Sequence, residues 1–213
     1  MKITEKRAEV VGIYLSDGYI YTKDNKWQIG FVGNPKTDLT LFENLKKIIK
    51  DEWNKEVNFK IRAKGLRMVF RSKEIKEFLI DYLKLPFGEG KCEKIFIPNQ
   101  IIGNWDLVKY VIRGLADTDG TIFVSKKKGV ENYPAIEITT TSKILAEQLK
   151  EILSEKSFHV ANIHKSKSKT SKRVAYRIAL YGRENVKKWV NEIGFSNKYK
   201  LERAKSYINS FKK

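Results

Sequence analysis

A nonapeptide that occurs twice organises this sequence. The first copy, Val10–Gly18, reads Val-Val-Gly-Ile-Tyr-Leu-Ser-Asp-Gly, and the second, Ile112–Gly120, reads Ile-Arg-Gly-Leu-Ala-Asp-Thr-Asp-Gly. Both have glycine at position three, an aliphatic residue at position four, serine or threonine at position seven and Asp-Gly at the end. Because the copies stand about half a chain apart in 213 residues, the sequence predicts a duplicated unit folded around them.

The same order of predicted elements follows each nonapeptide. In the first half, apolar periodicity and capping residues predict helices over 4–17, from 38 and over 72–83, and strands over 19–23, 27–32, 57–63 and 66–71. In the second half, they predict helices over 105–119, from 142 and over 184–193, strands over 121–127, 133–141, 158–164 and 173–181, a polar loop over 165–172 and a basic helix to about 211. This pattern predicts an α+β fold of two four-stranded antiparallel sheets with helices on one face. The expected divisions are 1–84, an irregular linker over 85–103, and 104–213.

The two nonapeptides should meet through small residues. Gly12 and Ser16 stand four apart, as do Gly114 and Thr118, and this spacing lets two helices approach closely. Contact along these strips would bring Asp17 and Asp119 together at two negative helix ends. Protonation of one acid or binding of a divalent cation such as Mg²⁺ would relieve the repulsion.

Composition narrows the class of partner. The net charge of +18 favours a polyanion, and nucleic acid above all. Cys92 is the single cysteine and two histidines are present, which excludes an internal disulfide and zinc-finger spacing. No apolar run is long enough for a membrane span, and 1–10 is too charged for a signal peptide. We therefore expect an intracellular protein, cytoplasmic or organellar, without a membrane partner.

The nonapeptides resemble the LAGLIDADG motif, and Arg113–Gly120 is the closer match. With the order of elements, the chain resembles a single-chain, two-motif LAGLIDADG homing endonuclease over nearly its whole length. The resemblance implies that the motif helices form a pseudo-twofold interface and that Asp17 and Asp119 bind the metal ions, with the carbonyls of Ser16 and Thr118 as further ligands. It also implies a monomeric, intron-encoded protein, although an intein origin stays open. Because self-splicing ends are missing, we expect a freestanding chain.

The resemblance implies further catalytic positions. A basic residue near the end of the fourth strand of each half would lie beside the scissile phosphate, and Lys73 and Arg183 are the candidates. A polar residue ending the second strand would order water: Thr140 in the second half, and either Asn34 or Lys36 in the first. At position six the first copy has Leu15 where the second keeps Asp117, which we interpret as structural.

Strand alternation predicts a nucleic-acid face on the open side of each sheet. Arginine and lysine suit phosphates or guanine, and glutamine suits adenine. The predicted contacts are Tyr19, Tyr21, Lys23, Gln28, Lys60, Arg62, Arg67 and Arg71 in the first half, and Phe123, Ser125, Lys127, Glu137, Thr139, Arg173 and Arg177 in the second. Two such sheets would cover a long, asymmetric duplex site.

The sequence thus predicts a metal-dependent endonuclease that makes double-strand breaks in DNA. Two alternatives stay open. One is a LAGLIDADG RNA maturase that binds its own intron RNA and assists splicing, and the other is a DNA-binding regulator that does not cleave. Retention of both acids, Asp17 and Asp119, favours cleavage over the second alternative.

Overall fold

The structure, a computed structural model, describes residues 1–23, 26–62, 65–167 and 173–209. The first half contains α1 (Glu5–Asp17), β1 (Gly18–Lys23), β2 (Lys26–Gly33), α2 (Leu39–Trp53), β3 (Phe59–Arg62), β4 (Gly65–Phe70), α3 (Lys73–Lys76) and the π-helical turn η1 (Glu77–Tyr82). The second half contains α6 (Trp105–Thr118), β5 (Gly120–Lys127), β6 (Val130–Thr140), α7 (Lys143–Glu155), β7 (His164–Lys167), β8 (Val174–Tyr181), α8 (Arg183–Glu192) and α9 (Lys198–Asn209). The predicted α+β class and the duplicated order of elements are confirmed.

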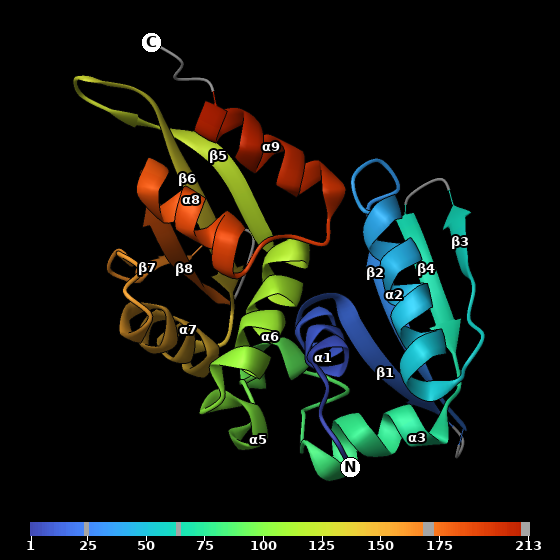
Figure 1. Cartoon of the computed structure of the whole chain (residues 1–213). Coiled ribbons are helices and arrows are strands. Elements are labelled where there is room, and N and C mark those ends of the chain that lie inside the picture. The colour runs from blue at the N-terminus through green and yellow to red at the C-terminus, as the bar shows by residue number, and fades with distance from the viewer. Residues whose placement is uncertain (24–25, 63–64, 168–172, 210–213) are drawn as a thin grey trace.

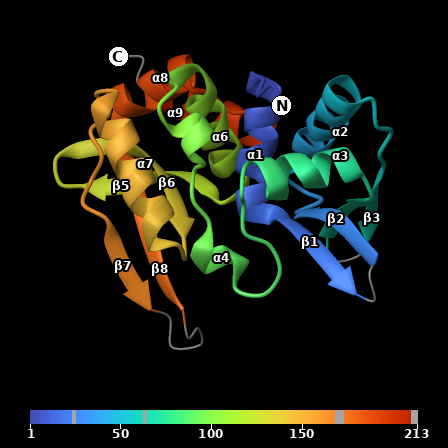
Figure 2. The same ribbon diagram turned by 90° about the horizontal axis from the view of Figure 1, so that it is seen from below.

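Each half forms one antiparallel sheet, in the order β1-β2-β4-β3 and β5-β6-β8-β7. Gly18 pairs with Phe31 in the first sheet, and Gly120 pairs with Ile138 in the second, so both nonapeptides lead directly into their sheets. Helices α1 and α6 lie side by side in the middle of the molecule, with one sheet on either side (Figure 1). From below, the helices gather toward one side of the molecule and the sheets toward the other (Figure 2).

Apolar periodicity explains which side of each sheet is covered. In α2, Leu41, Phe42, Leu45, Ile48 and Ile49 are buried, and the matching stripe of α7 is Leu145, Ala146, Leu149, Ile152 and Leu153. Along β4, Leu66 and Met68 point into this core, whereas Arg67 and Val69 are exposed. One face of each sheet therefore packs on helices, and the other stays open. None of the described helices combines the length and apolar character that a membrane crossing requires.

One predicted strand was wrong. We expected a strand over 158–164, but β7 begins at His164 and Val160 forms only an isolated bridge with Leu180. The apolar Phe158 packs against Trp189 of α8, while the polar residues after it form the edge strand, where lysines are common. The predicted polar loop over 165–172 is therefore strand as far as Lys167. Its remainder, 168–172, and the predicted turns at 24–25 and 64 lie outside the described residues.

The segment over 85–103 is more ordered than predicted. It contains two short helices, α4 (Lys91–Lys94) and α5 (Asn99–Ile102). Leu85, Ile95, Ile97 and Ile101 are buried although they follow no helical or strand period. The segment thus packs into the core, and α4 lies between the two sheets (Figure 2).

Candidate active site at the paired motif helices

The two motif helices touch through their glycines. A Cβ atom built on Gly12 would lie 2.1 Å from the Val111 carbonyl oxygen, and one built on Gly114 would lie 2.5 Å from the Glu9 carbonyl oxygen. Each would also lie 3.0 Å from the Cα atom of the other glycine. Only hydrogen fits between backbones this close, so the contact that the repeated glycines predicted is present.

This contact brings the two terminal acids together. Asp17 ends α1, Asp119 caps α6, and Ser16 of the first half lines the same pocket as Asp119 of the second. Burial, then the charges of Asp119 and Asp38, raise the pKa of Asp17 to about 7. Burial also raises the pKa of Asp119. The repulsion expected from the sequence is therefore present in the structure.

Two lysines, one buried and one half-buried, offset this negative charge. Lys91 of α4 donates from Nζ to the carbonyl oxygens of Tyr14 and Gly18, at the end of α1. The Nζ atom of Lys200 in α9 lies within hydrogen-bonding distance of four carbonyl oxygens at the end of α6: Ala116 (2.9 Å), Asp117 (2.8 Å), Thr118 (2.9 Å) and Gly120 (2.6 Å). Tyr14 and Ala116 share position five of the nonapeptides, and Gly18 and Gly120 share position nine. The lysines thus occupy matching places in the two halves.

Both lysines belong electrostatically to the acid pair. Burial lowers the pKa of Lys91 to about 8, and the charges of Asp119 and Asp17 oppose this shift. Burial also lowers the pKa of Lys200, and the same two acids, together with Asp117 and Asp38, oppose it. Lysine near the carbonyl end of a helix also compensates the helix dipole. The site is therefore a compact cluster of two acids and two cations.

Sequence reasoning missed both lysines because they lie outside the repeated unit. Lys91 follows η1 of the first half, Lys200 lies in α9 after α8 of the second, and no local pattern distinguishes them from the other lysines of this basic chain. Their position after each unit is the single signal that could have suggested them. The structure supplies the rest, since only the fold shows which helix ends they reach.

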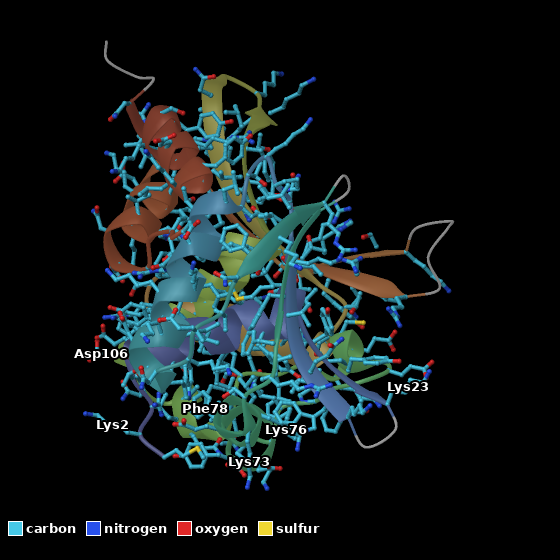
Figure 3. The ribbon with its side chains drawn as sticks, turned by 90° about the vertical axis from the view of Figure 1, so that its right-hand side faces the viewer. Lys2, Lys23, Lys73, Lys76, Phe78 and Asp106 are labelled. Carbon is cyan, nitrogen blue, oxygen red and sulfur yellow. The ribbon has the colours of Figure 1, made fainter. Side chains whose placement is uncertain are left out.

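The expected basic residues, Lys73 and Arg183, lie at the wrong ends of their sheets. β2 and β6 run toward the acids, and β4 and β8 run antiparallel to them, so the residues after β4 and β8 lie away from the helix ends. Lys73 is exposed, pairs with Glu77 at 3.7 Å and lies at the edge of the molecule beside Lys76 (Figure 3). Lys91 and Lys200 instead place their ammonium groups at the helix ends that carry the acids.

Each acid opens into its own pocket. Asp17 lines a pocket of about 600 Å³ with Asn34, Lys36 and Asp38, so both candidate water-ordering residues of the first half lie beside it. Asp119 lines a second pocket of about 310 Å³ with Ser16, Cys92, Thr139, Thr140, Thr141 and Arg173. Thr140 accepts a hydrogen bond from the Ser142 amide at 3.1 Å and lies in the Asp119 pocket as expected. The role of these residues stays a prediction.

Position six of the motif is structural in both halves. The buried carboxylate of Asp117 accepts hydrogen bonds from the amides of Ser196 (2.9 Å) and Asn197 (3.1 Å), and Leu15 is buried in the core. Asp117 therefore holds the chain that leads into α9 and so places Lys200 at the end of α6.

The predicted nucleic-acid residues lie on the open faces of the sheets. In the first sheet, Tyr21 pairs with Gln28, and Lys60 pairs with Arg67, so these side chains stand in rows across neighbouring strands. Shallow hollows between them are lined by Tyr21, Lys23, Gln28 and Arg71, and by Tyr19, Lys60, Arg62 and Arg67. In the second sheet, Thr139 pairs with Arg177, and Phe123, Ser125 and Glu137 stand on the same side. Lys127 lies at the irregular end of the β5–β6 pairing, and Arg173 precedes β8.

The acid pair suits a hard divalent cation. Two carboxylates with raised pKa and nearby backbone carbonyls form the oxygen-rich donor set that Mg²⁺ prefers. No group of three or more His, Cys, Asp or Glu side chains suited to holding an ion occurs among the described residues. Oxygen ligands from water or from a bound molecule would complete the coordination. The carbonyl groups of Ser16 and Thr118 are the two further predicted ligands. The Thr118 carbonyl already accepts a hydrogen bond from Lys200, so a cation bound there would share this oxygen with the lysine.

The raised pKa of Asp17 predicts a measurable cost to stability. Between pH 4 and 7 the folded state retains a proton that the unfolded chain, with an ordinary aspartate pKa, has lost, so stability falls as pH rises through this window. Asp17→Asn should remove the share of this dependence that Asp17 contributes and raise the free energy of unfolding at pH 8 by roughly a few kcal/mol in EDTA. Urea denaturation at pH 5 and pH 8 measures it. The matched control is Asp81→Asn, at an exposed position; equal pH dependence of the natural protein and Asp17→Asn would contradict the prediction.

Comparisons with known proteins show which proteins this chain is similar to. The profile of the LAGLIDADG-like domain family matches residues 106–194. The replication factor C small subunit of Methanocaldococcus jannaschii is 30% identical over 205 residues, which make up 96% of this chain and 10% of that protein. The chain therefore spans about a tenth of the length of this curated relative.

Solved structures share the fold. I-DmoI in complex with DNA and Ca has a TM-score of 0.64 and 17% identity, over 94% of this chain and 96% of that chain. The homing endonuclease I-WcaI bound to its DNA recognition sequence has a TM-score of 0.62 and 15% identity, over 94% of this chain and 88% of that chain. At this identity, the likeness shows the common fold.

Proposed function

We propose that this chain, a two-motif LAGLIDADG protein, is a metal-dependent endonuclease that cuts both strands of double-stranded DNA at a long, asymmetric site. The observation that carries the proposal is the meeting of Asp17 and Asp119 at the ends of α1 and α6, between two sheets with basic open faces. The structural relatives crystallised with DNA and with Mn, Mg or Ca support a DNA substrate and a divalent cation. Mg²⁺ is the proposed ion, and the chain is proposed to act as a monomer.

Asp17 and Asp119 would hold the cations, one acid facing each pocket. A bound divalent cation lowers the pKa of a bound water and stabilises negative charge on the phosphate. Ser16 of α1 reaches the pocket of Asp119, so the first half contributes to the site of the second. Because the two pockets open on different residues, each DNA strand would meet its own acid and its own set of water-ordering side chains.

Lys91 and Lys200 would act as fixed positive charges. Their ammonium groups are already held by backbone carbonyls, so neither lysine is placed to shuttle protons. Preorganised charge of this kind stabilises the negative charge that develops during phosphodiester hydrolysis without reorganisation at the moment of reaction. This role replaces the one expected of Lys73 and Arg183.

Digestion of a pooled duplex library tests the proposed function. The purified chain, incubated with Mg²⁺ or Mn²⁺, should generate new ends on both strands of one long sequence, and EDTA should prevent them. Sequencing of the captured ends identifies the target site. Retained duplex binding without new ends would contradict cleavage and indicate a DNA-binding protein that does not cut.

A further inference from the structure

We infer that the arginines of the two sheets hold DNA unequally: those of the first sheet have no acidic partner among the described residues, whereas glutamates compete with DNA for those of the second. The inference deepens the proposed function, on which it rests, because it concerns how the proposed DNA surface is divided. It starts from the partners that each arginine has in the structure.

The first sheet presents arginines without acidic partners. Arg62, Arg67 and Arg71 are exposed and form no ion pair with any residue in the described part of the chain. The four strands of this sheet contain five lysines and arginines and no Asp or Glu. Two hollows lie on this face, one lined by Arg71 and the other by Arg67. Gln28 lines both of them, so its side-chain amide stands between the two arginines. This face combines uncompensated positive charge with groups that can contact bases.

The second sheet presents arginines that are already paired. Arg173 contacts Glu93 of α4, with 2.5 Å between Nε and Oε1, at the Asp119 pocket. Arg177 of β8 contacts Glu137 of β6, with 3.9 Å between Nε and Oε1. Glu137 is only about one-fifth exposed, so its charge is partly desolvated beside Arg177. Both glutamates therefore compete with DNA for these guanidinium groups.

This difference should appear in the salt dependence of binding. Each phosphate neutralised by a cation releases counterions, and log K falls with log salt with a slope of about −0.9 per contact. Arg67 and Arg71 can contact phosphates or bases without breaking an ion pair. Arg173 and Arg177 must first break their ion pairs with Glu93 and Glu137. Removing an arginine of the first sheet should therefore weaken binding more, and reduce the slope of log K against log salt more, than removing an arginine of the second sheet.

Paired variants test the inference in binding alone. The full chain is titrated with a fluorescent duplex long enough to cover both sheets, in EDTA, over a series of salt concentrations. Arg67→Gln with Arg71→Gln should weaken binding by roughly tenfold or more and reduce the slope by about two. Arg173→Gln with Arg177→Gln should reduce the salt slope by less than half as much as the first-sheet pair does. These positions are exposed or partly exposed, and thermal unfolding verifies that each variant is folded.

Removing the competing glutamates should have the opposite effect. Glu93→Gln with Glu137→Gln should tighten binding by roughly two- to fivefold, the range of an exposed ion pair, and steepen the salt slope. The matched control is Glu147→Gln with Glu184→Gln, which removes two exposed glutamates that pair with lysines on α7 and α8. Equal losses from the two arginine pairs, or a gain no larger than that of the control, would overturn the inference while leaving the proposed function intact. Failure of the unchanged chain to bind any duplex at low salt would overturn both.

Discussion

Replacing Gly12 or Gly114 with alanine should unfold much of this protein under conditions in which the natural chain is folded. The added methyl group would meet backbone atoms of the facing helix, at 2.1 Å in α6 and 2.5 Å in α1. Backbone cannot swing away as a flexible side chain can, so α1 and α6 would have to separate along their contact. We expect a loss of about 3 kcal/mol or more in the free energy of unfolding, at the upper end of overpacking.

Gly103→Ala is the matched control for this prediction. Gly103 caps α5 in a right-handed helical conformation, and a Cβ atom built there would have nothing within 4 Å. The substitution should therefore change the free energy of unfolding by less than about 0.5 kcal/mol. Urea denaturation compares the three variants. A loss at Gly12 or Gly114 no larger than that at Gly103 would show that the helices do not meet as described.

Much of the fold followed from the sequence because the repeat and the hydrophobic periods agree. The glycines of both nonapeptides predicted the α1–α6 contact, and the stripe from Leu41 to Ile49 predicted α2. The strand beginning at His164 was misplaced because apolar residues before it pack in the core rather than pair in the sheet. Local patterns could not distinguish these two uses of an apolar residue.

The residues of the candidate site that lie inside the repeated nonapeptide could be predicted from the sequence. Asp17 and Asp119 occupy one motif position, and their meeting follows from the helix contact. Lys91 and Lys200 come from segments outside the repeat, and only the tertiary fold brings them to the helix ends. Lys73 and Arg183 failed as candidates because antiparallel pairing sends the ends of β4 and β8 away from the acids. Sequence position alone could not give this direction.

Asp17→Asn and Asp119→Asn should each abolish double-strand cleavage without loss of folding. Asparagine keeps the size of the side chain but removes the charge that would hold a divalent cation. Since a bound cation contributes several kcal/mol to phosphoryl chemistry, we expect the rate of double-strand cleavage to fall by a factor of roughly 1,000 or more. Removing one of the two carboxylates also relieves the repulsion at the helix ends, so stability should be retained or improved. The loss can therefore be assigned to chemistry rather than to unfolding.

Linearisation of a supercoiled plasmid that carries the recovered target site tests the shared two-acid centre most directly. With Mg²⁺ the natural chain should convert the plasmid to the linear form. Asp17→Asn and Asp119→Asn should bind the same plasmid and leave it circular, either uncut or nicked. Linear product from either variant at the rate of the natural chain would contradict the assignment of cleavage to the paired acids at the ends of α1 and α6.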